Sequence, residues 1–318
     1  MIILGRSTAI RIGYDTGSSH CIEVHSFAEL RRMRAVMRRR ETLVQWSLAA
    51  VALSAIAVLA LIIIFIFKEG SPIIARLGMA QFIAGTKWSP TRGMFGILPM
   101  ILGSVWVTLG ALIIGVPIGL ATAIFLAEMA PSKTSRILKS AIQLLAGIPS
   151  VIFGFIGLII LVPLIRQWLG GPGFSILAAG IVLGIMILPT IISVCYDVLK
   201  AVPQAYREGM LALGATRWQT IRMVVLPAAR PGIIAAVILG MGRAVGETMA
   251  VIMVAGNATK IPVSPLEPVR TLTSNIALEM GYAVGEHREA LFATGIVLFA
   301  VIALLNTLAR LVARVEKV

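Results

Sequence analysis

Charged residues are scarce in this chain of 318 residues: Asp, Glu, Lys and Arg together make up 13% of it. A soluble globular domain has about 25% charged and about 45–50% apolar residues. Here the apolar share reaches 58%, and the mean hydropathy is +0.96. This composition excludes a soluble enzyme, a disordered regulator and a coiled coil, and it predicts one membrane-embedded unit.

Cysteine and histidine are also rare. Cys21 and Cys195 are far apart, and His20, His25 and His287 lack the close spacing of metal ligands. The chain has no GxxxxGK[ST] phosphate-binding loop and no recognisable nucleophile–base pair. We therefore expect no metal site, no cofactor bound by this chain and no catalytic residue.

Long apolar stretches are abundant, by contrast. Six of them are long enough to cross a bilayer as helices, the structure that satisfies backbone polar groups in lipid. We expect an all-α integral membrane protein whose residues 42–318 form one six-helix domain. The expected spans are about 43–67, 97–127, 140–165, 174–196, 231–255 and 290–309. GxxxG pairs at Gly115/Gly119, Gly180/Gly184 and Gly242/Gly246 favour a tightly packed bundle.

The net charge of +14 comes from 28 Lys and Arg against 14 Asp and Glu. Most of these bases lie in short segments between apolar stretches, as in membrane proteins that use them to set orientation. With the N-terminus placed inside, the inner segments hold more than twice as many bases as the outer ones. Both termini are therefore expected in the cytoplasm, and nucleic acid is not expected as a partner.

Two segments precede the first span. Residues 1–26 are polar and irregular, and we expect a disordered extension. In residues 27–41, apolar side chains recur at helical spacing between arginines. This pattern predicts a basic amphipathic helix on the anionic inner surface of the bilayer; the alternative is a solvated basic anchor.

The loop at 197–230 lies between the fourth and fifth spans. Composition predicts a helix over 204–213, ended by Gly214, and a second helix from the N-cap Thr216 to Leu226, ended by Pro227. Such a knob exposes apolar side chains next to charged ones, which is typical of a docking site. The side chains in question are Tyr206, Met210, Leu211 and Trp218.

This loop resembles the EAA loop of bacterial ABC importer permeases. The family pattern is Glu-Ala-Ala, a glycine after three more residues, and Ile-x-Leu-Pro. Here Gly209 and Met210 replace the two alanines, and Val224 replaces the isoleucine. The resemblance implies a type I importer bundle whose coupling helix inserts into a separate ATP-binding subunit. The matching coupling residues are Glu208, Gly209, Gly214, Ala215, Leu226 and Pro227.

Arg243 and Glu247 are charged residues inside the fifth span. Being four apart, they are expected on one helix face, where Glu247 would hold Arg243 while the path is empty. A charge in the bilayer is costly and usually marks a pathway. The guanidinium presents a fork of donors that matches an oxyanion. The alternative is a buried ion pair that only fixes helix packing.

The segment 242–248, GRAVGET, resembles the permeases of phosphate-specific ABC importers. Met249-Ala250-Val251 and Gly256-Asn257 resemble the PstC type of permease, and the likeness covers about 42–318. It implies a bacterial inner-membrane complex with a second permease (PstA type), an ATPase dimer holding ATP and Mg²⁺ (PstB type) and an extracytoplasmic phosphate-binding protein (PstS type). It also implies that Arg243, Glu247 and Thr248 lie on the substrate path.

Three other functions remain open from the residues. An ABC permease for another oxyanion or small solute would also use Arg243. A secondary transporter or channel would explain the spans but not the loop at 197–230. A membrane-bound enzyme would need a site that the sequence does not show.

Overall fold

A computed structural model describes the backbone of residues 27–315 and the side chains of residues 44–307. The expected extension 1–26 and the side chains of the expected interfacial helix 27–41 lie outside the described residues. The chain divides into two units, Met1–Ile64 and Phe65–Val318. Helix α1 (Phe27–Leu77) begins in the first unit, and the remaining elements belong to the second.

The second unit is almost entirely helical. Its elements in chain order are α2 (Met79–Ala84), β1 (Trp88–Ser89), the 3₁₀ turn η1 (Pro90–Arg92), β2 (Met94–Phe95), α3 (Leu98–Ile124), the π-helical turn η2 (Phe125–Met129), α4 (Ser132–Ala146), α5 (Ser150–Ile156), the π-helical turn η3 (Gly157–Leu161), α6 (Val162–Leu169), α7 (Ile176–Ala201), α8 (Gln204–Ala212), α9 (Arg217–Thr220), the π-helical turn η4 (Ile221–Val225), α10 (Leu226–Gly246), α11 (Met249–Val254), α12 (Leu272–Glu279) and α13 (Glu286–Val315).

The described residues contain six helices long and apolar enough to cross a membrane, as the sequence predicts. The second, fourth and sixth lie close to their expected positions, and the first extends to Leu77. The spans are Val44–Leu77, Leu98–Met129, Ser150–Leu169, Ile176–Ala201, Arg217–Gly246 and Glu286–Thr307.

The expected bounds of the third span, 140–165, are wrong at its start. Residues 140–146 belong to α4, and the span begins at Ser150. Pro149 lacks a backbone N–H and disfavours a helical conformation of the residue before it, so a helix end is favoured at this point. It stands instead as the N-cap of α5.

The expected bounds of the fifth span, 231–255, are wrong at both ends. Helical structure runs from Arg217 to Gly246, and α11 is a separate helix. Pro227 does not end the helix as expected, because α10 begins at Leu226 and passes through it. The π-helical turn η4 comes immediately before; such a turn shifts the hydrogen-bond ladder by one residue, where a proline lacking its N–H is tolerated.

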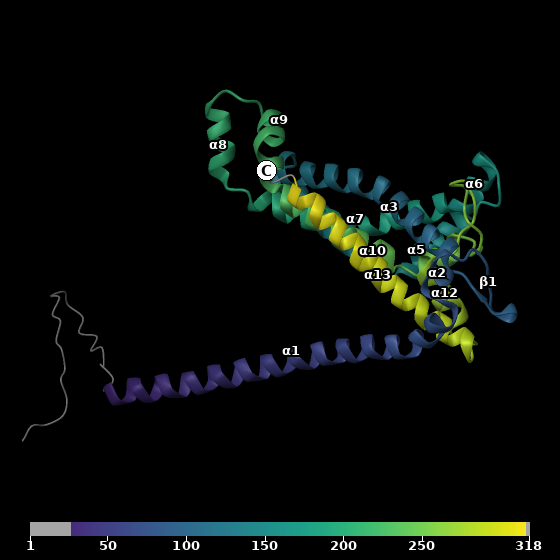
Figure 1. Cartoon of the computed structure of the whole chain (residues 1–318). Coiled ribbons are helices and arrows are strands. Elements are labelled where there is room, and N and C mark those ends of the chain that lie inside the picture. Colours follow the sequence, from purple (N-terminus) through teal and green to yellow (C-terminus); the bar gives the residue numbers. More distant parts are fainter. Residues whose placement is uncertain (1–26, 316–318) are drawn as a thin grey trace, which may run out of the picture. The chain divides into compact units, whose positions relative to one another are not determined.

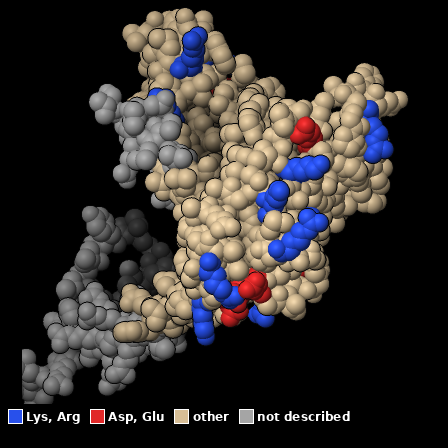
Figure 2. Space-filling view, turned by 45° about the vertical axis from the view of Figure 1, so that its right-hand side comes forward, with Lys and Arg blue, Asp and Glu red and all other residues tan. Residues whose placement is uncertain are grey.

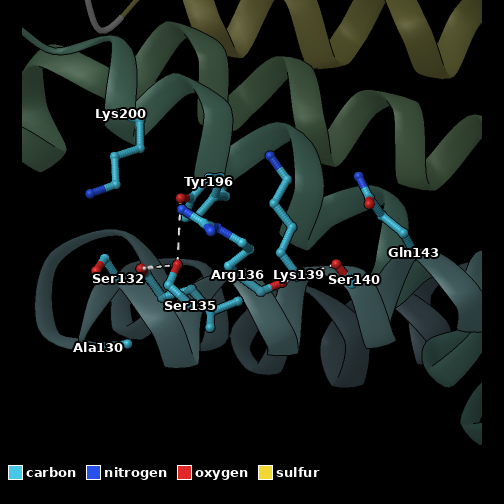
Figure 3. Close-up of a pocket in the computed structure, with 10 residues that line it drawn as sticks. Ala130, Ser132, Ser135, Arg136, Lys139, Ser140, Gln143, Tyr196 and Lys200 are labelled. Carbon is cyan, nitrogen blue, oxygen red and sulfur yellow. Dashed lines mark hydrogen bonds between the residues drawn. The ribbon is translucent and has the colours of Figure 1, made fainter.

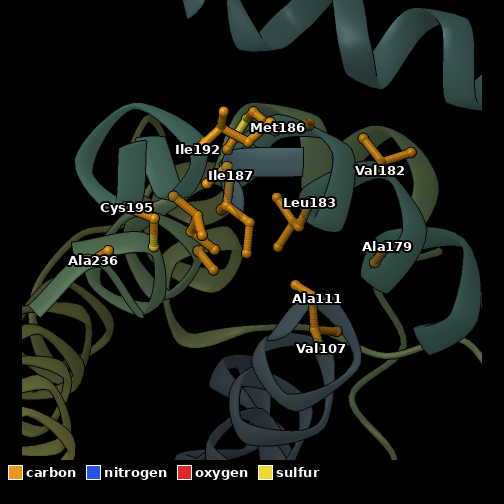
Figure 4. Packing of buried hydrophobic residues seen from close by; sticks show 14 of the residues in the cluster. Val107, Ala111, Ala179, Val182, Leu183, Met186, Ile187, Ile192, Cys195 and Ala236 are labelled. Carbon is orange, nitrogen blue, oxygen red and sulfur yellow. The ribbon is translucent and has the colours of Figure 1, made fainter. Parts of the chain in front are cut away.

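Helix α7 is the centre of the second unit. It packs between α3 and α10, and its buried side chains meet those of both neighbours (Figures 1 and 4). Glycines permit the close approach of α3 and α7: a Cβ on Gly115 would lie 2.8 Å from Ile187, and one on Gly180 would lie 3.3 Å from the backbone of Gly110. Two of the three GxxxG pairs thus form this contact.

The two ends of the second unit differ. Helices α8 and α9 project from one end, whereas α2, α6, α12 and strand β1 lie at the other (Figure 1). The two strands pair antiparallel, with Trp88 opposite Phe95. On the face drawn in Figure 2, charged residues form only a few small groups on a broad uncharged surface, as expected of a protein surrounded by lipid.

Candidate functional site

The fifth span breaks at the residues that the sequence singles out. Helix α10 ends at Gly246, Glu247 adopts an extended conformation, and α11 begins two residues later. The carboxylate of Glu247 accepts a hydrogen bond from the backbone N–H of Ala250 at 3.1 Å. Gly246 is a poor helix former, and this carboxylate satisfies an amide that would otherwise need a helical partner. The break therefore arises locally.

Arg243 lies one turn before the break on an exposed part of α10. Its Nη1 donates a hydrogen bond to Thr190 Oγ1 of α7 at 3.3 Å. A Cβ added at Gly242 or Gly246 would meet nothing within 4 Å. Arg243 is itself exposed, so this part of α10 is uncovered in the single chain.

The expectation that Arg243 and Glu247 share one helix face is wrong, because the helix ends between them. Among the described residues, Arg243 has no carboxylate within ion-pair distance. The alternative of a buried pair that fixes packing loses its basis for the same reason. Arg243 is instead a cation held by a hydroxyl and exposed in the single chain.

Helix α12 reaches the break from a distant part of the sequence. Thr273 Oγ1 donates to the backbone carbonyl of Glu247 at 3.0 Å, and the backbone N–H of Leu272 donates to Ser104 Oγ of α3 at 2.9 Å. Hydroxyls of Thr190 and Thr273 therefore accompany Thr248 near the break. Sequence reasoning missed Thr190, Ser104 and Thr273, because single hydroxyls in apolar or loop segments give no pattern that predicts their contacts.

The second candidate site is the α8–α9 knob. Gly214 has φ of +81°, in the left-handed region that favours glycine. Thr216 caps α9 as expected: it accepts from the N–H of Gln219 at 3.3 Å, and the Gln219 side chain accepts from the N–H of Thr216 at 2.7 Å. Glu208 and Gly209 are exposed on α8, Ala215 and Leu226 are half-buried, and Pro227 is exposed.

Apolar side chains on the knob remain uncovered in the single chain. Tyr206 and Trp218 are each 54% exposed. Leu211 is also exposed, whereas Met210 is half-buried. Together with the exposed Glu208, these residues form a mixed apolar and acidic surface of the kind that docks to a partner.

A buried ion pair fixes the base of the knob. Arg207 binds Glu128 with two hydrogen bonds of 2.7 and 3.1 Å, and both side chains are nearly buried. The same guanidinium donates to the carbonyls of Val202 and Leu199. A bidentate pair of this kind is geometrically specific, so α8 is tied to η2 and to the end of α7. The sequence gives no sign of this pair, since its members are 79 residues apart.

Known sequences resemble most of the chain. It is 44% identical to the "Probable ABC transporter permease protein YqgH" of Bacillus subtilis over 276 residues, which cover 85% of this chain and 89% of that protein. It is 38% identical to the "Phosphate transport system permease protein PstC" of Haemophilus influenzae over 292 residues, with 85% and 92% covered.

A solved structure supports the fold, and a family description matches the chain from the middle of the second span through the sixth. An inward-facing structure of the MetNI methionine ABC transporter matches with a TM-score of 0.56 at 21% identity, covering 72% of this chain and 99% of that one. Residues 115–316 match the family described as "Binding-protein-dependent transport system inner membrane component". The chain is therefore a multi-pass membrane protein that belongs to this family of transport permeases.

Proposed function

We propose that the chain is the PstC-type permease subunit of an ATP-driven importer of inorganic phosphate. The observation that carries this proposal is Arg243: a cation without a carboxylate partner among the described side chains, at a break in a membrane span, exposed in the single chain. The similarity to PstC permeases favours phosphate as the anion. An importer of another oxyanion remains the second candidate, because the same guanidinium suits any of them.

Arg243 would bind phosphate through its fork of N–H donors. The Thr190 hydroxyl holds the guanidinium in place, at 3.3 Å from Nη1. Glu247 forms no ion pair with it among the described residues, and one oxygen of that carboxylate accepts from the N–H of Ala250. Thr248 follows at the break. We expect each of two paired permeases to contribute one charge-assisted hydrogen bond to the anion. Such binding would be strong enough to retain the anion during transfer and weak enough to allow its release.

The knob would transmit the motion. We expect α8 and α9 to dock on a separate ATPase of the PstB type, which alone binds ATP and Mg²⁺. The partners would be a PstA-type permease and a PstS-type binding protein. In this arrangement the knob and both termini face the cytoplasm of a bacterium, and the Arg207–Glu128 pair carries movement of the knob to η2 and α7.

Uptake of labelled phosphate tests this proposal in cells that depend on the complex. Arg243→Gln should lower the initial rate at least tenfold, and Arg243→Lys, which keeps the charge but loses the fork, should retain an intermediate rate. Lys133→Gln is the matched control, because it removes an exposed charge from α4 and should leave uptake unchanged. Normal uptake by Arg243→Gln in a correctly assembled complex would refute the proposed role.

A further inference from the structure

A cavity of about 360 Å³ lies between α4 and α7, at the end of the bundle that carries the knob. It is separate from the break in the fifth span. Three cationic residues line it: Arg136 and Lys139 rise from α4, and Lys200 points from α7 towards the start of α4, on the side of Ser132 (Figure 3). The remaining polar lining consists of Ser132, Ser135, Ser140, Gln143 and Tyr196.

The charges of this cavity are only partly balanced. Lys139 binds Asp197 at 2.7 Å and lies over the ring of Tyr196, with its Nζ 4.3 Å from the ring centroid. Arg136 and Lys200 have no ion-pair partner among the side chains that the structure describes. No carboxylate lines the cavity itself. Two uncompensated cations therefore face one open, polar space.

The lining also offers neutral donors. Ser135 is occupied, since its hydroxyl donates to the carbonyl of Leu126, and Ser140 donates to the carbonyl of Arg136. The Ser132 hydroxyl and the Gln143 side-chain amide make no hydrogen bond to any other residue that the structure describes. Ser132 also begins α4, whose N-terminal amides add partial positive charge. A guanidinium, an ammonium, a hydroxyl and an amide together suit the several oxygens of a phosphate group.

The surface of α4 places this cavity beside the bilayer. Ile137 and Leu144 on the same helix are 63% and 77% exposed. A helix with cations on one side and exposed apolar residues on another is suited to the membrane interface. The cavity is thus within reach both of a lipid headgroup and of an anion in solution.

We propose that the α4–α7 cavity is a binding site for a phosphate group, held by Arg136 and Lys200. The group belongs either to an anionic phospholipid or to free inorganic phosphate. This site does not depend on the transport function proposed above, because none of its residues lies at the break.

Two binding measurements on the purified complex in nanodiscs distinguish the sources. The first counts phosphatidylglycerol molecules retained on the protein by native mass spectrometry, with phosphatidylcholine as the neutral competitor. The second measures binding of labelled inorganic phosphate in nanodiscs made of phosphatidylcholine alone. Each uses the natural chain, the double variant Arg136→Gln/Lys200→Gln and the control Lys133→Gln, which removes a charge from α4 outside the cavity. Equal melting temperatures establish that the variants fold.

We expect the double variant to weaken at least one of the two bindings about tenfold, because hydrogen bonds to charged groups are lost, and the control to weaken neither. A loss confined to phosphatidylglycerol assigns the site to lipid, and a loss confined to labelled phosphate assigns it to the free anion. The proposal is overturned if both bindings survive the double variant, if neither probe binds the natural chain, or if Lys133→Gln weakens binding equally.

Discussion

Glu279 accepts hydrogen bonds from three separate parts of the chain. Trp88 Nε1 of β1 donates to it at 2.8 Å, Arg270 binds its other oxygen, and His287 Nε2 of α13 lies 2.8 Å away. Burial alone would raise the pKa of this carboxyl, but the bonds from Trp88, His287 and Arg270 and the charge of Arg270 outweigh it and lower the pKa below 4.5. This residue joins the strand pair, the loop before α12 and the last span.

Glu279→Gln should destabilise this end of the protein by about 3 kcal/mol at neutral pH, because it leaves the nearly buried Arg270 without its counter-ion. A lowered folded-state pKa means that the ionised carboxylate stabilises the fold fully above about pH 4.5 and ceases to do so as the pH falls through the lower, folded value. The difference in melting temperature between natural and variant protein should therefore shrink below pH 4.5. A constant difference down to pH 3 would contradict this account.

Single residues also mark the limit of what the sequence predicts. Arg243 and Glu247 are conspicuous because charges are rare in apolar spans, and their spacing of four suggests a helical pair. The pairing fails because α10 ends at Gly246, so Glu247 is no longer on the helix face of Arg243, and one of its carboxylate oxygens accepts from the nearby N–H of Ala250. Whether Glu247 faces Arg243 depends on where the helix ends. The periodicity of apolar residues does not determine that position.

The knob shows how far local rules reach within an element. Gly214 correctly predicts the turn after α8, and Thr216 correctly predicts the N-cap of α9. A left-handed turn residue and a helix cap both depend on neighbouring residues in the sequence. Pro227 gives a wrong one, because a proline usually ends a helix and here the preceding π-helical turn accommodates it. The contacts of Arg207 and the approach of α12 to the break join segments that are far apart in the sequence. No local sequence pattern predicts them.

Gly214→Ala should loosen the knob, because an alanine in the left-handed conformation costs about 1–2 kcal/mol. Hydrogen exchange of the α8 amides should become faster, and less ATPase should copurify. Gly281→Ala is the control, since this glycine lacks a positive φ and has open space around its Cβ position. Unchanged exchange in Gly214→Ala would show that the turn does not hold α8.

Glu128→Gln should reduce the number of phosphate ions imported per ATP hydrolysed, because it breaks the nearly buried pair between η2 and α8. Measurements of hydrolysis and uptake in the same proteoliposomes give this ratio. Glu286→Gln is the control: it breaks an exposed pair with Arg76 at the opposite end, and exposed pairs contribute little. An unaltered ratio in Glu128→Gln would rule out transmission through this contact.

The membrane spans differ in how much of their surface is buried within this chain. In the most apolar window of α7, 67% of residues are buried within the chain, compared with 22% for the fifth span. The fifth span carries Arg243 on an exposed part, next to Gly242 and Gly246, where an added Cβ would meet nothing within 4 Å. Lipid or a second permease must cover such a surface. Composition predicts six membrane helices well, but it does not say which faces meet a partner.

A path between two permeases would place Arg243 in water rather than lipid. Cysteine accessibility tests this most directly: Arg243→Cys is combined with Cys21→Ser, while Cys195 stays because it is buried. The assembled complex is treated with a charged, water-soluble thiol reagent, with Ile113→Cys on the exposed surface of α3 as the control. We expect rapid modification at position 243, slowed by phosphate and altered by ATP, and little at position 113. A cysteine at position 243 that stays unmodified with and without ATP would contradict the account.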